Sequence, residues 1–337
     1  MRIGLTYDLR SYYLAAGFDE EEIAEFDRDD TVEAIESALM DLGHHTDRIG
    51  NAYQLIERLA RGDRWELVFN IAEGMYGIGR EAQVPAILDV YNIPYTFSDP
   101  LVMSLTLHKG MTKRVIRDAG IPTSDFCVVE KEGDEKEVNF SPPFFIKPVA
   151  EGTGKGISPH SIIRSMGDLG QACSFMRREY QQPVLVEPYL SGREFTIGIT
   201  GTGLDARILG SMEVVLLANA EPGVYSYINK ERSEELVEYR PVKPESDISV
   251  QQSEWIALQA WQVLGCRDAG RIDIRCDEAG NPYFLEVNPL AGLHPDHSDL
   301  PIIGKMVNFS YLSLIEQIML SAKKRIKNQN AIKREKE

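Results

Sequence analysis

Residues 270–289, GRIDIRCDEAGNPYFLEVNP, decide much of the fold. Two segments of alternating apolar residues flank a turn built on DEAGNP, and this pattern predicts a β-hairpin. The strands carry Asp273, Glu286 and Asn288, where an antiparallel core would want apolar side chains. Carboxylates that face one another across paired strands repel, whereas Mg2+ prefers oxygen ligands and leaves positions for substrate phosphates. The hairpin therefore predicts a site for Mg2+ or Mn2+. The alternative is a solvated hairpin whose acids face water.

A second stretch, FFIKPVAEGTGKGIS at residues 144–158, combines an apolar strand that reaches Lys147 with a glycine-rich loop containing Thr153 and Gly154. Glycine lets backbone amides approach phosphate oxygens closely, and lysine supplies a positive charge. The loop does not have the GxxxxGK[ST] pattern of a P-loop. A phosphate-binding turn and a flexible hairpin tip therefore both remain open.

Other nucleotide-binding candidates lie along the chain. A strand in VLVEPYLSGRE, residues 184–194, ends near Glu187, which could accept the amino group of adenine, and Glu194 could hold ribose hydroxyls. Lys109 opens a basic amphipathic helix, and Lys230 lies in the irregular segment 219–242. Any one lysine is more often a surface charge than a ligand, so the order of the whole set carries the interpretation.

That order resembles the ATP-grasp superfamily, and most closely its D-alanine–D-alanine ligase family. The matching runs are LHKGMTKRVIRDAGIP, FIKPVAEGTGKGIS, VLVEPYLSGREFTIGI, GRIDIRCDEAGNPYFLEVNP and GLHPDHSDLP, spread over residues 95–303. The resemblance implies an α/β (α+β) ATP-grasp fold, with an N-terminal Rossmann-like parallel-sheet domain and two β-rich lobes that clamp ATP. It also implies ATP and Mg2+ as cofactors.

The resemblance assigns a role to each matching residue. Lys109 and Lys147 match lysines that hold ATP phosphates, and Asp273, Glu286 and Asn288 match the magnesium ligands. The remaining matches are the adenine linker (Glu187, Leu190), the ribose acid (Glu194), the phosphate-covering loop (Thr153, Gly154), the lid lysine (Lys230), the oxyanion donors (Arg271 and the Gly292 amide) and a residue near the carboxylate of the second substrate (Ser298). The implied reaction is carboxylate–amine ligation through an acyl phosphate, with release of ADP and phosphate.

The chain departs from the family where the substrates would bind. The family's Gly-Gly loop, whose glutamate holds the first ammonium group, is absent after the first strand. Because a buried ammonium needs a carboxylate, we expect Asp8 or Glu73 to take this role in a pocket facing the glycine-rich loop. The alternative is that Asp8 caps a helix and Glu73 pairs with Arg80. A different dipeptide or an amino-acid conjugate is therefore an open alternative to D-Ala-D-Ala.

Two histidines, His294 and His297 in HPDH, allow three readings: a zinc site, a contact with the substrate carboxylate, or a surface pair. Zinc is disfavoured because no cysteine or third histidine accompanies them.

Strand–helix alternation in the first hundred residues predicts a parallel sheet, with strands at 2–6, 65–74 and 93–99 and helices at 29–44 and 80–92. We expect four parts: an N-terminal domain (1–100), a central subdomain (101–186), a C-terminal subdomain with the metal site (187–323) and a basic tail (324–337). Residues 219–242 are the expected lid.

The composition narrows the possible partners. A net charge of −16 disfavours phosphate backbones, no apolar run approaches a membrane span, and four scattered cysteines favour a reduced, cytoplasmic setting. We expect small amino-acid-like substrates, no nucleic-acid or membrane partner, and a chain compatible with a homodimer. Competing functions are nucleotide binding without turnover and phosphotransfer to a stable acceptor.

Overall fold

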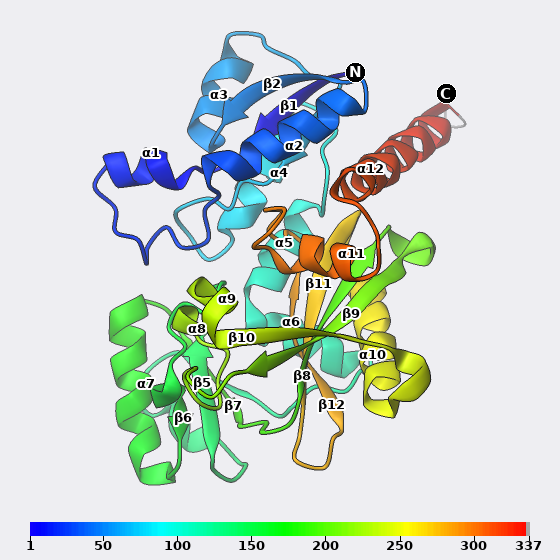
Figure 1. Cartoon of the computed structure of the whole chain (residues 1–337). Helices are drawn as coiled ribbons and strands as arrows, with labels where there is room; N and C mark the ends of the chain where they lie inside the picture. Colours follow the sequence, from blue (N-terminus) through cyan, green and yellow to red (C-terminus); the bar gives the residue numbers. More distant parts are fainter. Residues whose placement is uncertain (335–337) are drawn as a thin grey trace.

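The computed structural model describes residues 1–334, and an N-terminal α/β layer lies above two β-rich lobes (Figure 1). The N-terminal sheet is parallel, with strand order β2-β1-β3. Its elements are β1 (Arg2–Thr6), α1 (Arg10–Ala15), α2 (Asp29–Asp41), β2 (His45–Gly50), α3 (Ala52–Ala60), β3 (Leu67–Asn70) and α4 (Gln83–Val90).

This layer departs from expectation at two places. The predicted strand at 93–99 is wrong, because only a single bridge from Val68 to Tyr95 forms, and Phe97 has a positive φ of 68° that interrupts extended backbone. Strand β2 was not predicted, since its sequence HTDRIG is polar over most of its length. The edge position of β2 in the sheet allows this polarity.

The central lobe is a four-stranded antiparallel sheet of order β4-β7-β5-β6. Buried Phe144, Ile146 and Val186 pack against Cys173 and Met176 of α7, which covers one face. The elements are α5 (Pro100–Leu107), α6 (Lys109–Asp118), β4 (Cys127–Val129), β5 (Phe144–Pro148), β6 (Ile162–Ile163), α7 (Met166–Tyr180) and β7 (Val184–Pro188).

The C-terminal lobe is a five-stranded antiparallel sheet of order β10-β9-β8-β11-β12. Fully buried Trp261 of α10 packs against its strands, and the final helix α12 returns to the N-terminal core, where Ile315 and Ile318 join Ile3 and Leu39. The elements are β8 (Glu194–Thr200), β9 (Arg207–Leu216), α8 (Tyr227–Glu231), α9 (Ser233–Leu236), β10 (Val237–Val242), α10 (Ile248–Leu264), β11 (Ala269–Cys276), β12 (Pro282–Asn288), α11 (Asp299–Met306) and α12 (Tyr311–Arg334).

The hairpin predicted at residues 270–289 is confirmed as β11 and β12. Segment 219–242, which was expected to be irregular, contains regular elements. It contains α8, α9 and β10, and β10 pairs with β9. The fully buried Asn229 donates hydrogen bonds from Nδ2 to the carbonyls of Val224 and Glu221, at 2.9 and 3.0 Å. Within the described part of the chain, no helix is long and apolar enough to cross a membrane.

Candidate active site

The β11–β12 hairpin gathers four polar side chains on one face of the sheet. Asp273 lies opposite Glu286, and Arg271 lies opposite Asn288. Since side chains two residues apart share a face of a strand, all four point the same way. Arg271 Nη1 pairs with Asp273, and Asn288 Nδ2 donates to Asp273 Oδ2 at 3.4 Å. The predicted metal ligands are therefore adjacent.

Two lysines from other elements approach Glu286. Lys109 Nζ lies 3.6 Å and Lys147 Nζ 3.9 Å from Glu286 Oε2. Burial favours the neutral acid, but Lys109, Lys147 and Lys230 outweigh it and hold the pKa of Glu286 well below its usual range. Glu286 therefore remains an anion beside the lysines.

The donor set suits magnesium better than zinc. Two carboxylates and one amide leave open positions, as Mg2+ bound to substrate phosphates requires. Among the side chains that the structure describes, residues 1–327, no group of three or more His, Cys, Asp or Glu has metal-binding geometry. His294 and His297 therefore lack the further ligands that a structural zinc site needs.

A narrow cavity between the lobes collects the predicted adenine and ribose residues. It is lined by Phe145, Lys147, Ile157, Glu187, Pro188, Tyr189, Leu190, Glu194, Tyr225, Lys230, Asp273, Arg275, Leu285 and Glu286. Glu194 pairs with Arg275 Nη1 at 3.0 Å, and Arg275 Nη2 also donates to the carbonyl of Gly223 in the lid at 2.9 Å. The ribose candidate is thus connected to the lid.

Glu187 lies in a buried ion-pair network that was not predicted. Lys113 Nζ is 2.5 Å from Oε1, Lys147 Nζ is 3.1 Å from Oε2, and Ser124 Oγ donates to Oε1 at 3.0 Å. Despite burial, Lys113 and Lys147 lower the pKa of Glu187 to about 2. Glu187 lines the nucleotide cavity, but both of its oxygens already face lysines, so its expected contact with adenine stays a prediction.

The glycine-rich loop closes a second cavity, of about 100 Å³, beside the metal ligands. Gly154 has φ +74°, and a Cβ there would lie 2.9 Å from the backbone nitrogen of Tyr227 in the lid. The loop and the lid backbone are therefore in close contact. The cavity is lined by Glu25, Glu73, Glu81, Thr106, Leu107, Lys109, Glu151, Gly152, Thr153, Arg271, Glu286, Val287, Asn288, Pro289, Leu290, Ala291 and Gly292.

Of the two expected ammonium anchors, the structure places only Glu73 at this cavity. Asp8 lines none of the cavities described here. Its carboxylate accepts hydrogen bonds from Tyr13 Oη at 2.7 Å and the Gly74 amide at 2.9 Å. Both oxygens of Asp8 are thus already engaged inside the protein. These bonds hold the chain beyond β1 in place.

Glu25 and Arg80 are site residues that the sequence did not reveal. Arg80 pairs with Glu25 Oε2 at 2.5 Å, not with Glu73, and donates from Nη1 to the Ala150 carbonyl at 2.9 Å. Glu25 also accepts a hydrogen bond from the Gly152 amide. The acid-rich loop at residues 19–30 contains too many carboxylates for the sequence to single out one.

Glu81 is a third acid at this cavity. Burial, reinforced by Glu25, raises the pKa of Glu81 to about 7 although Arg80 opposes the shift. Burial and the nearby Glu81 likewise raise the pKa of Glu73 well above its ordinary value. Both carboxylates would be stabilised as anions by a bound ammonium group.

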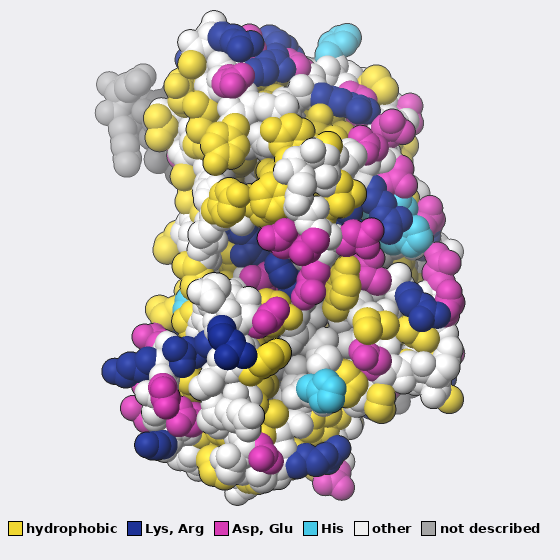
Figure 2. Space-filling view, turned by 90° about the vertical axis from the view of Figure 1, so that its left-hand side faces the viewer, with side chains coloured by type: hydrophobic (Ala, Val, Ile, Leu, Met, Phe, Trp, Pro, Cys, Tyr) yellow, Lys and Arg dark blue, Asp and Glu magenta, His cyan; other side chains and the backbone are white. Residues whose placement is uncertain are grey.

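A third site cavity, of about 380 Å³, lies between the N-terminal layer and the lid. On this side of the molecule, acidic and basic side chains crowd the hollowed boundary between the upper layer and the lobes (Figure 2). Arg271, Gly292, Ser298 and Lys230 all line the cavity. Ser298 Oγ accepts the His294 amide at 2.9 Å, which fixes the loop that presents it.

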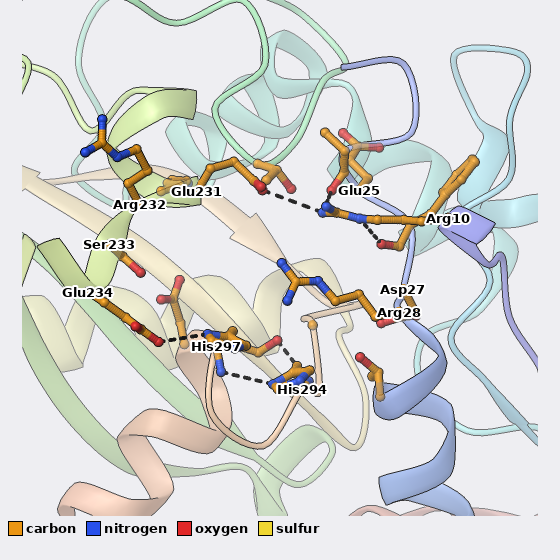
Figure 3. Close-up of a pocket in the computed structure, with 18 of the residues that line it drawn as sticks. Arg10, Glu25, Asp27, Arg28, Glu231, Arg232, Ser233, Glu234, His294 and His297 are labelled. Atoms are coloured by element: carbon orange, nitrogen blue, oxygen red, sulfur yellow. Dashed lines mark hydrogen bonds and ion pairs between the residues drawn. The ribbon is translucent and has the colours of Figure 1, made fainter. Parts of the chain in front are cut away.

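The histidine pair forms one wall of this cavity (Figure 3). His294 Nε2 lies 3.2 Å from Asp30 Oδ2 and His297 Nδ1 lies 3.6 Å from Glu234 Oε1. The two rings therefore connect the loop after β12 to α2 and to the lid, which agrees with a substrate-facing loop more than with an isolated surface pair.

Known proteins that are similar to this chain include a ligase domain family and several named ligases. The family model described as "D-ala D-ala ligase C-terminus" matches residues 115–320. D-alanine–D-alanine ligases of Bordetella petrii and Aquifex aeolicus are 31% and 30% identical, each over 86% of this chain and over 82% and 93% of their own. An uncharacterised protein, y4sG of Sinorhizobium fredii, is 31% identical over 77% of this chain and 75% of its own.

Solved structures share the fold. A D-alanine–D-alanine ligase from Bacillus anthracis complexed with ATP superposes with a TM-score of 0.74 at 20% identity, over 98% of this chain and 99% of that one. The VanG D-Ala:D-Ser ligase from Enterococcus faecalis gives 0.72 at 18% identity, over 95% and 99%. The expected arrangement of a parallel-sheet domain and two β-rich lobes is thereby confirmed.

Proposed function

This chain belongs to the D-alanine–D-alanine ligase family of ATP-grasp enzymes, and from that premise we propose that it joins the carboxylate of one amino-acid-like molecule to the amine of another. The reaction consumes ATP and yields ADP, phosphate and an amide. The four free cysteines fit the reduced, cytoplasmic setting proposed for it.

The observation that carries the proposal is the position of the charged groups. Lys230 lines both the nucleotide cavity and the 380 Å³ cavity, and Arg271 lines both the 380 Å³ cavity and the 100 Å³ cavity. Phosphate, donor carboxylate and acceptor amine would therefore meet at one point. We assign the 100 Å³ cavity to the carboxylate donor and the 380 Å³ cavity to the amine acceptor.

The roles that the resemblance implies are supported by where the side chains lie. Lys109 and Lys147 would neutralise phosphate oxygens beside Glu286, while Asp273, Glu286 and Asn288 would hold Mg2+. A bound magnesium ion supplies charge neutralisation for phosphoryl transfer. Glu187 and Leu190 would hold adenine, Glu194 the ribose, and the Thr153–Gly154 turn would cover the phosphates.

The second half of the reaction uses the groups between the two substrate cavities. Attack of the acceptor amine on the donor carbonyl forms a C–N bond and breaks the carbon–oxygen bond to phosphate. Arg271 and Gly292 line both cavities, and the Arg271 guanidinium and the Gly292 amide would stabilise the oxyanion formed in between. Glu73 would hold the donor ammonium, and Ser298 would contact the acceptor carboxylate. The lid keeps water from the reactive acyl phosphate.

The acceptor cavity favours a substrate larger than alanine. Pockets of about 300–1,000 Å³ typically hold ligands of drug size, and this cavity measures about 380 Å³. The relatives are named for D-alanine–D-alanine ligation. In this chain, the region expected to bind the first substrate contains the ion pair between Glu25 and Arg80. A different dipeptide or an amino-acid conjugate is therefore the second candidate product.

A phosphate-release screen across pairs of D- and L-amino acids, with mass spectrometry of the amide, tests the proposal. Glu286→Gln is the matched control, since it removes the metal-binding charge. We expect phosphate and amide in equal amounts for at least one pair, and only in the presence of magnesium. ATP-analogue binding without turnover for any pair would instead indicate a nucleotide-binding protein, and transfer of phosphate to a stable acceptor would indicate a kinase-like reaction.

A further inference from the structure

Arg10 reaches from the N-terminal layer toward the lid. Its Nε donates to the Phe26 carbonyl at 2.8 Å and its Nη2 to the Ala24 carbonyl at 2.5 Å. These two bonds fix the guanidinium against the loop that follows α1. The same Nη2 lies 3.6 Å from Glu231 Oε1, with side chains 25% and 31% exposed (Figure 3).

Glu231 directly follows Lys230, the lid residue placed between the nucleotide and acceptor cavities. Both residues belong to the single short helix α8 (Tyr227–Glu231). Lys230 Nζ lies 4.7 Å from the centre of the Tyr225 ring. A contact that holds the end of α8 therefore also determines where the ammonium of Lys230 lies.

Other contacts hold a different part of the lid. Tyr189 Oη and Arg275 Nη2 both donate to the Gly223 carbonyl, at 2.8 and 2.9 Å. The His297–Glu234 contact joins the loop after β12 to the lid near Lys230. Glu234 is 81% exposed, however, and the contact is ionic only when the histidine is protonated. Arg10 and Glu231 thus form an ion pair from α8 to the N-terminal layer that does not depend on a histidine.

We propose that Arg10 and Glu231 are positioning residues, a latch that holds the closed lid against the N-terminal layer and sets Lys230 over the phosphates. This inference rests on the proposed ligase function, because Lys230 can contact phosphate only if ATP binds beside it. Arg10 is pre-positioned by its two carbonyl contacts, so forming the pair on closure fixes only the glutamate side chain, which lowers the entropy lost.

Three variants test the latch: Arg10→Gln, Glu231→Gln and the double variant. Exchange of amide hydrogens in residues 226–236 and the affinity for a non-hydrolysable ATP analogue with Mg2+ are measured first, without turnover. The fraction of ADP released without amide product is measured next. Arg240→Gln is the matched control, because Arg240 pairs with Glu238 in the same segment and both side chains are about half exposed, 52% and 46%.

We expect each single variant to weaken analogue binding roughly two- to fivefold, the range that a partly exposed ion pair supports, and to lose exchange protection around Lys230. The double variant should be no weaker than either single one, because both changes remove the same contact. The uncoupled fraction of ADP should rise as water enters an imperfectly closed site. High salt should reduce the difference from wild type.

The outcomes separate this inference from the proposed function. If the wild type binds the analogue and orders its lid while all three variants match it and Arg240→Gln, the latch is refuted and the ligase proposal stands. If the wild type binds no ATP analogue, the ligase proposal itself fails. Thermal unfolding of each variant identifies any loss that comes from misfolding, and additive losses in the double variant would also refute a shared contact.

Discussion

Replacing Glu187 by glutamine should lower both the stability of the protein and its affinity for ATP, because the nucleotide site contains this one buried negative charge between two lysines. Glu187 is 2% exposed and lies between Lys113 and Lys147, which are 0% and 2% exposed. The change keeps the shape of the side chain and removes its charge. Two buried ammonium groups would then lack their common counter-ion.

The magnitude follows in two independent ways. Removing one partner of a buried ion pair costs about 3–5 kcal/mol. The pKa of Glu187 falls from 4.5 in the unfolded chain to about 2 in the folded protein, which corresponds to about 3 kcal/mol at roughly 1.4 kcal/mol per pH unit. Because the folded pKa is depressed, this stabilisation is complete above pH 4.5 and is lost as pH falls toward 2.

Calorimetry at pH 7 measures the effect. We expect the Tm of Glu187→Gln to fall by about 6–12 °C and the affinity for an ATP analogue to fall with it. Glu238→Gln, which removes an exposed partner of Arg240, should change Tm by no more than about 1 °C. A Glu187→Gln protein as stable as wild type, or one whose stability deficit persists unchanged toward pH 2, would refute the reasoning.

Three further predictions concern the substrates and the metal. Glu286→Gln should fold normally yet lose about 100-fold or more in turnover with Mg2+ present, and wild-type turnover would contradict the assignment. Glu73→Gln should raise KM for the carboxylate donor without changing KM for ATP, whereas Asp8→Asn should lower Tm and leave both KM values unchanged. Donor KM should rise as pH falls through about 7, where Glu81 takes up a proton, and Glu81→Gln should remove that part of the pH dependence.

The order of motifs resembles that of ATP-grasp ligases, and this resemblance was enough to predict the fold and the candidates for ATP binding, whether they lie on strands, helices or loops. Asp273 and Glu286, for example, lie in adjacent strands of one hairpin, so their proximity follows from local pairing. Lys113 was not recognised, since a lysine in a basic helix normally faces solvent. Lys113 is buried because α6 packs against α10 and β12, which turns its side chain toward Glu187 of β7.

The substrate-facing contacts could not be predicted because they join distant segments. Glu25 meets the Gly152 amide across 127 residues of sequence, and Arg80 lies 55 residues from Glu25. Neither pairing leaves a local pattern. Asp8 was a reasonable candidate at the end of β1, but the Tyr13 hydroxyl and the Gly74 amide occupy its carboxylate, and these partners depend on how the loop after β1 folds back.

Transfer of an oxygen isotope tests the central claim most directly. The donor amino acid is labelled with ¹⁸O in its carboxylate, and the released phosphate and nucleotide are analysed by mass spectrometry. The account predicts ADP as the nucleotide product and one ¹⁸O atom in each phosphate, because the carboxylate oxygen that attacks the γ-phosphorus leaves with it when the amide forms. Unlabelled phosphate, or label recovered in AMP, would contradict an acyl-phosphate ligase.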